Sequence, residues 1–108
     1  MISTHILDTQ VGSPASNVSV SLSIKSEIGS WSEIQTAKTN DDGRIVFDCE
    51  AKAGTYQLNF IVEEYFERSG NEYFFTEAPV IFKVSNTNRK YHVPLLLNSF
   101  GYATYRGS

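Results

Sequence analysis

The 108-residue sequence has a single cysteine, Cys49, and only two histidines, His5 and His92. One cysteine excludes a disulfide bond within the chain, and no second cysteine or neighbouring histidine suggests a metal site or a redox pair. We therefore expect no metal and no cofactor, and we interpret Cys49 as a small buried hydrophobic residue. Any chemistry that depends on an imidazole has two candidate side chains.

Positive charge is also scarce. Nine lysines and arginines against twelve acidic residues give a net charge of −3. Because there is no basic run or stripe, nucleic acid is not an expected partner. No apolar run approaches the roughly 20 residues that cross a membrane, and the first residues lack the pattern of a signal peptide. The expected location is the cytoplasm, away from any membrane.

The composition is that of a folded protein, with 41% hydrophobic and 13% aromatic residues. A chain of this length buries roughly 60–70% of its unfolded surface, which is enough for one hydrophobic core. We find no internal repeat, linker or low-complexity segment, so the sequence predicts a single domain over residues 1–108.

Short alternating segments dominate the sequence. In residues 18–24 apolar side chains alternate with serines, a pattern typical of a half-buried strand. Further strands are predicted at residues 2–7, 31–37, 44–47, 54–61, 80–84, 91–97 and 102–105. Residues 12–17 and 39–43 have turn composition. The only predicted helix covers residues 63–69, where acids come first and Gly70 can end the helix.

Eight short strands separated by turns indicate an all-β sandwich. A sandwich alone does not decide function, because many unrelated functions occur on the same fold.

Alternation also gives the directions of the two histidines. His5 and Ser3 share one face of the first strand, opposite its more apolar face, and His92 lies opposite the apolar face of the penultimate strand. Pro94, on the same side as His92, cannot donate a backbone hydrogen bond, so we expect an edge or an irregularity there. The two histidines can therefore be neighbours on outward faces.

Four segments together form a pattern that is specific to one family. They are Thr4–Asp8, Asp42–Arg44, Tyr91–Leu96 and Tyr102–Ser108. In this order they resemble the 5-hydroxyisourate hydrolases, the transthyretin-related enzymes of purine breakdown. The resemblance covers essentially the whole chain, and its most specific parts are the His92 segment and the final Tyr-Arg-Gly-Ser.

The resemblance implies a transthyretin-like sandwich of eight strands with one short helix. It also implies a homotetramer, a dimer of dimers, whose active sites lie in a central channel between dimers. The implied activity is hydrolytic ring opening of 5-hydroxyisourate to 2-oxo-4-hydroxy-4-carboxy-5-ureidoimidazoline in urate degradation.

The family's site residues fall on His5, Arg44, His92 and the segment Tyr105-Arg106-Gly107-Ser108. His5, Arg44, His92 and Ser108 are the expected catalytic residues, and His5, Arg44 and Tyr105 are expected to bind substrate. Histidine suits a base that titrates near neutral pH, and the sequence leaves open which of the two is the base. Arginine suits the planar, urea-like edge of the substrate. Ser108, with its carboxylate, is expected to orient a histidine or the attacking water.

Two other functions fit the predicted fold. One is a non-enzymatic, transthyretin-like carrier of a small aromatic ligand, and the other is a prealbumin-like adhesion or carbohydrate-binding domain. The transthyretins proper lack the Tyr-Arg-Gly-Ser segment and the paired histidines, so the sequence favours the enzyme. An alternative role for Arg106 is to anchor this segment across a subunit interface.

Overall fold

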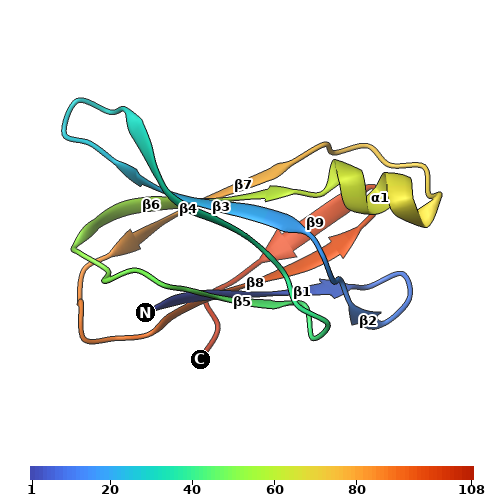
Figure 1. Cartoon of the computed structure of the whole chain (residues 1–108), viewed down its shortest axis with the longest axis horizontal. Coiled ribbons are helices and arrows are strands. Elements are labelled where there is room, and N and C mark those ends of the chain that lie inside the picture. Colours follow the sequence, from blue (N-terminus) through green and yellow to red (C-terminus); the bar gives the residue numbers. More distant parts are fainter.

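The computed structural model describes every residue from Met1 to Ser108. Two β-sheets face each other, and one short helix lies at one end of the sandwich (Figure 1). The first sheet has the strand order β2-β1-β8-β9, with β5 also paired to β1, and the second has the order β4-β3-β6-β7. The predicted all-β sandwich with one short helix is confirmed.

The elements follow one another along the chain with these bounds: β1 (Ile2–Asp8), β2 (Ser13–Pro14), β3 (Ser19–Lys25), β4 (Trp31–Lys38), β5 (Arg44–Phe47), β6 (Gly54–Ile61), α1 (Glu63–Ser69), β7 (Ala78–Val84), β8 (Tyr91–Asn98) and β9 (Gly101–Thr104).

The β1–β8 pair is the only parallel pair; the others are antiparallel. It joins the first long strand of the chain to the penultimate strand in the middle of the first sheet. Thr4, which faces the core, is fully buried, and its hydroxyl donates a 2.6 Å hydrogen bond to the carbonyl of Val93 on β8. This contact satisfies a polar group that would otherwise be costly to bury.

The core lies between the two sheets and follows the predicted alternation. Along β1 the inward residues Ile2, Thr4 and Ile6 are fully buried, while Ser3 and His5 between them are only half-buried. Cys49 is half-buried, packs against the core, and has a raised thiol pKa because of that burial. The largest fully buried side chains include Tyr56, Phe60, Phe66, Leu22, Leu58, Leu95 and Leu97.

Helix α1 begins and ends as its sequence predicts. Glu63 and Glu64 occupy its first turn and Arg68 its last, which suits the helix dipole. Gly70 follows with φ 71°, a left-handed conformation that glycine adopts at little cost. Phe66 is the buried residue that attaches the helix to the sandwich. At seven residues, this only helix is too short to cross a membrane.

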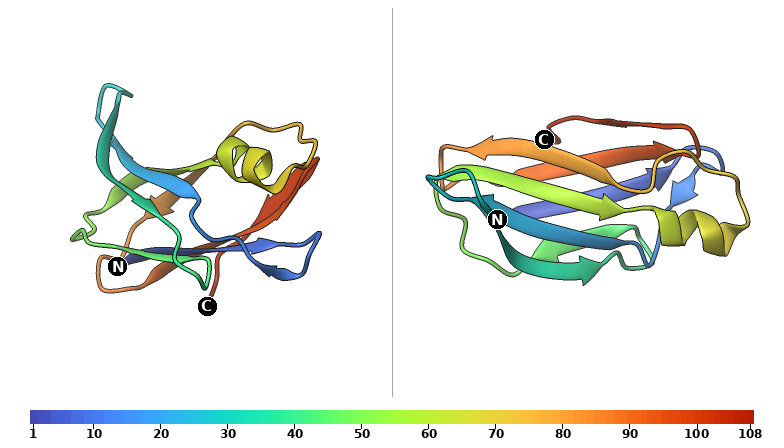
Figure 2. Two further views of the ribbon diagram at one scale, coloured as in Figure 1. Left: turned by 45° about the vertical axis from the view of Figure 1, so that its right-hand side comes forward. Right: turned by 90° about the horizontal axis from the view of Figure 1, so that it is seen from above.

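The structure differs from the sequence prediction in a few places. The turn predicted at residues 12–17 contains a two-residue strand, β2, which pairs with the end of β1. The last strand was predicted to reach Tyr105 but ends at Thr104. At the opposite edge, the β3–β4 hairpin twists away from the sandwich (Figure 2), and most of β4 is exposed.

The first prediction concerns the core. Leu95→Ala should lower the free energy of unfolding by about 2–5 kcal/mol, because this fully buried side chain leaves a cavity between tightly packed sheets. Ile81→Ala, at a residue 59% exposed on β7, is the matched control and should change it by less than about 1 kcal/mol. Urea denaturation followed by circular dichroism measures both variants. Equal effects would contradict this account of the core.

Candidate active site

Strand pairing brings His5, Arg44 and His92 together on the outer face of the first sheet. His5 on β1 lies directly opposite Arg44 on β5, so the two side chains share a face. On the other side of β1, Ser3 lies opposite His92 on β8. The histidines therefore occupy neighbouring strands, as predicted, with a two-residue offset along them.

The turn before β5 places Arg44. Asn40 accepts hydrogen bonds at Oδ1 from the backbone N–H groups of Asp42, at 3.0 Å, and Arg44, at 2.9 Å. Gly43 adopts φ 73°, and its carbonyl accepts a 2.8 Å hydrogen bond from the N–H of Ile6. A side chain at Gly43 would meet the carbonyl oxygen of Ile6 at 2.6 Å, so only glycine lets the turn approach β1 this closely.

The imidazole of His92 is held between Ser3 and Gly107. Its Nδ1 shares a 2.9 Å hydrogen bond with the hydroxyl of Ser3. The opposite edge lies against Gly107, where a Cβ would come within 2.5 Å of the His92 Cδ2 atom and 3.2 Å of Pro94. The backbone N–H of Gly107 donates a 2.8 Å hydrogen bond to the carbonyl of His92. Any larger residue at position 107 would displace the ring.

The surroundings of His92 keep its ring uncharged. Burial lowers the pKa of His92 below 6.5, and the positive charges of Arg44 and His5 lower it further. Each of these effects disfavours the imidazolium form. His92 is therefore neutral at neutral pH, with a lone pair on one ring nitrogen.

The residues after β9 continue its pairing with β8 after one interruption. The ladder ends at the Leu95–Thr104 pair and resumes, in the same register, at the bridge between His92 and Gly107. Pro94 lies in the gap, where it has no N–H to donate, so the expected irregularity is confirmed. Although Pro94 lies on the same side as His92, the returning segment covers it, and it is buried rather than facing outward.

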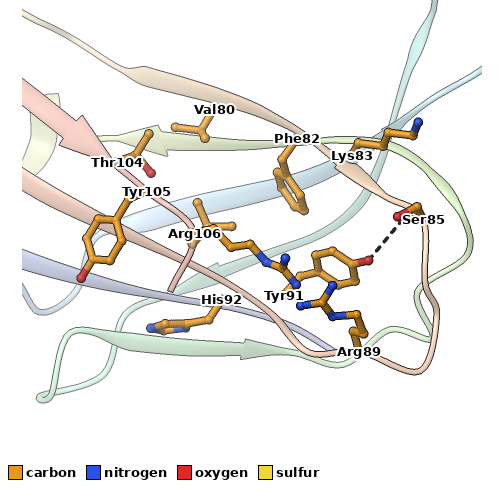
Figure 3. Close-up of a pocket in the computed structure, with 11 residues that line it drawn as sticks. Val80, Phe82, Lys83, Ser85, Arg89, Tyr91, His92, Thr104, Tyr105 and Arg106 are labelled. Atoms are coloured by element: carbon orange, nitrogen blue, oxygen red, sulfur yellow. Dashed lines mark hydrogen bonds between the residues drawn. The ribbon is translucent and has the colours of Figure 1, made fainter. Parts of the chain in front are cut away.

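The other residues of this segment point to different places. Tyr105 is 57% exposed, and Ser108 is also exposed. The guanidinium of Arg106 lies over the ring of Tyr91 in the same chain, 5.3 Å from its centre. Figure 3 shows Arg106 and Arg89 beside Tyr91, whereas the ring of His92 points away from them.

A cleft of about 220 Å³ lies beside His92, between β7 and the start of β8. Its cationic side chains are Lys83, Arg89 and Arg106, and His92 and Tyr105 also line it (Figure 3). His5 and Arg44 are not part of its lining. The cleft therefore adjoins the face that carries the two histidines and Arg44, and shares His92 with it.

The structure brings together three of the residues predicted from the sequence, and adds a fourth. His5, Arg44 and His92 share one face, but the partner of the His92 ring nitrogen Nδ1 is the hydroxyl of Ser3 and not Ser108. The sequence already indicated that Ser3 lies on the same strand face as His5. Its partner could be identified only once β1 and β8 were known to be parallel neighbours. No group of three or more His, Cys, Asp or Glu residues is placed to hold a metal ion.

Comparison with known families gives this arrangement a context. The sequence model of the HIUase/Transthyretin family matches residues 2–107. The chain belongs to this family. Among curated relatives, the 5-hydroxyisourate hydrolase of Salmonella typhi is 47% identical over 100% of this chain and 81% of its own length. The mouse 5-hydroxyisourate hydrolase is 40% identical over 99% of this chain and 94% of its own.

Solved structures of both branches of the family superpose well on this member. The Klebsiella pneumoniae 5-hydroxyisourate hydrolase has a TM-score of 0.85 at 38% identity, covering 99% of this chain and 98% of that one. Sea bream transthyretin in complex with thyroxine has a TM-score of 0.92 at 31% identity, covering 98% and 93%. The backbone therefore fits both branches and does not by itself separate them.

The second prediction concerns the charge of His92. In a His5→Asn variant, His92 is the only histidine left, and its ring should titrate with a midpoint below 6.5 by NMR. The unfolded chain binds this proton more tightly than the folded chain, so folded-state stability should fall as the pH drops below about 6.5. His5→Asn also removes one neighbouring charge, so the remaining shift reports burial and Arg44. A midpoint at or above 6.5 would contradict the described environment.

Proposed function

We propose that this protein is a 5-hydroxyisourate hydrolase, which opens the ring of its substrate to give 2-oxo-4-hydroxy-4-carboxy-5-ureidoimidazoline in urate degradation. The names of the curated relatives, at 47% and 40% identity over essentially the whole chain, support the activity. The structural observation that supports this activity is that His5, His92 and Arg44 lie on one face of the first sheet.

The reaction needs a base that removes a proton from water as it attacks a ring carbonyl. A base must be unprotonated at the working pH, and the lowered pKa of His92 keeps its ring in that form. We therefore assign the base to His92. His5, two residues further along the sheet, is then placed to protonate the leaving ring nitrogen or to hold the water.

Arg44 supplies the positive charge of the site. Its guanidinium can donate parallel hydrogen bonds to the carbonyl oxygens of a planar substrate, and the oxyanion that forms on attack gains from the same charge. Tyr105, which is exposed beside the cleft, is assigned to substrate contact. Ser108 is assigned to ordering the water or the substrate, since the Nδ1 atom of His92 is already engaged by Ser3.

A partner subunit would complete this site. The face around the histidines carries the apolar residues Leu7 and Leu96, both half-buried, and Val46, which is 63% exposed. Covering this face with a second copy would bury the apolar residues and exclude bulk water from the reaction. We therefore propose the homotetramer, a dimer of dimers, as the active form. The single domain over residues 1–108 and the cytoplasmic location stay predictions.

A carrier of a small aromatic ligand is the second candidate, because the thyroxine-bound transthyretin superposes so closely on this chain. A carrier binds its ligand without changing it. Such a function does not require a neutral His92 ring that is held on both edges near Arg44. The two functions therefore differ in what mutation of the histidines would do.

The third prediction tests the activity directly. Urate oxidase acting on urate generates 5-hydroxyisourate in place, and its ultraviolet absorbance should decay faster when this protein is present. His5→Ala and His92→Ala should each lower kcat by about 10²–10⁴-fold, the usual contribution of a positioned acid or base. Unchanged circular dichroism is the control for folding. Decay at the spontaneous rate with a folded tetramer would make ligand transport the leading function.

The fourth prediction concerns the segment after β9. Removing residues 105–108 should abolish turnover, because it takes away Tyr105, Ser108 and the glycine that holds His92 in place. The shortened chain should stay folded, since none of these residues belongs to the buried core. Circular dichroism and the decay assay measure the two properties. An unfolded product would show that the segment is structural.

A further inference from the structure

We propose that Ser3 is a positioning residue for His92. The hydroxyl of Ser3 binds Nδ1 and so leaves Nε2 as the ring nitrogen that is free to act on the attacking water. The expected effect on catalysis rests on the proposed hydrolase function, whereas the hydrogen bond between Ser3 and His92 belongs to the folded chain itself. Ser3 is not among the site residues identified from the sequence, and its hydroxyl forms a hydrogen bond with the His92 ring alone.

The ring of His92 fits a slot whose two walls differ in chemistry. One wall is the Ser3 hydroxyl on β1, 2.9 Å from Nδ1, and the other is the Cα of Gly107, against the Cδ2 edge. A Cβ at position 107 would come within 2.5 Å of Cδ2, so only glycine leaves room for the ring at this edge. It carries no side chain, and its N–H already donates to the carbonyl of His92.

Shape alone does not fix the orientation of an imidazole in such a slot. A rotation of 180° about the last side-chain torsion exchanges Nδ1 with Cδ2 and Nε2 with Cε1, and the flipped ring occupies nearly the same volume. Broad, roughly two-fold preferences are usual for this torsion. Only the hydrogen bond with Ser3 distinguishes a nitrogen from a carbon at this edge, so Ser3 also decides where Nε2 lies.

The type of partner also matters. A carboxylate beside Nδ1 would favour the imidazolium form and raise the pKa of His92, whereas a serine hydroxyl is uncharged. With Nε2 as the base, the neutral ring carries its proton on Nδ1, and this N–H donates the hydrogen bond to the Ser3 hydroxyl. The same hydrogen bond persists after Nε2 takes up a proton. Ser3 thus orients the base without making it charged at rest.

The position of Ser3 follows from the sheet and not from a flexible loop. Ser3 and His92 are directly opposite each other in the parallel β1–β8 pair, and Thr4, the next residue, is fully buried and bonded to Val93. The backbone beneath the serine is therefore fixed. A reacting side chain is positioned more precisely when its support lies on strands than when it lies on a loop.

The test compares Ser3→Thr with Ser3→Val, two side chains of the same shape that differ in the hydroxyl. Ser3→Val should lower kcat by about three- to tenfold with little change in KM, the effect of losing one hydrogen bond that orients a base. Ser3→Thr should restore at least half of the wild-type kcat. Ser21→Ala, on the half-buried face of β3 in the other sheet, is the control and should leave kcat unchanged.

A second measurement is independent of turnover. In ¹⁵N-labelled protein carrying His5→Asn, the Nδ1 resonance of His92 should move in Ser3→Val and stay in place in Ser3→Thr. Equal kcat values for the Val and Thr variants in an active enzyme, or equal Nδ1 resonances, would overturn the proposal. A wild-type protein that fails to accelerate substrate decay would overturn the hydrolase function instead, and the resonances would still decide the role of Ser3.

Discussion

The parallel pairing of β1 with β8 is the contact on which the rest of the structure depends. It places strands from the two ends of the sequence side by side in the middle of one sheet. The buried hydrogen bond from Thr4 to Val93 fixes the strands against each other on the core side. On the outer side the same register sets Ser3 against His92 and places His5 two residues away. A one-residue slip of either strand would turn its histidine toward the core, where the imidazole would lack a partner.

The outer face explains how one backbone can support both branches of the family. The chain superposes on a hydrolase and on a thyroxine-bound transthyretin with TM-scores of 0.85 and 0.92, so the sandwich itself does not separate catalysis from binding. In this chain the outer face presents His5 on β1, Arg44 on β5 and His92 on β8. Arg44 and His5 lower the pKa of His92, and a sheet face with other residues at these positions would provide only a binding surface.

The segment after β9 owes its path to Pro94. Because proline has no N–H, the ladder between β8 and β9 cannot continue past it, and the chain leaves the sheet at Tyr105. It returns at Gly107, the one position where a side chain would collide with the ring of His92. Between these points Arg106 lies over Tyr91 and stabilises the returning path. One proline and one glycine thus produce both the bend and the contact with the histidine.

The sequence by itself determined the strands, the helix and the faces of the two histidines, because each depends on alternation or on local turn chemistry. Val20 and Leu22 alternate with serines, and Gly70 ends the only helix, so neither needed knowledge of distant residues. The sequence also carried the motifs that identify the family. Only the tertiary structure decided that Ser3 bonds to His92, and that Pro94 is covered by the returning segment. Both depend on which strands are neighbours and in what register. Ser3 and His92 are about ninety positions apart in the sequence. The segment that covers Pro94 rejoins the sheet at the His92–Gly107 bridge, beyond an interrupted ladder that no local pattern predicts.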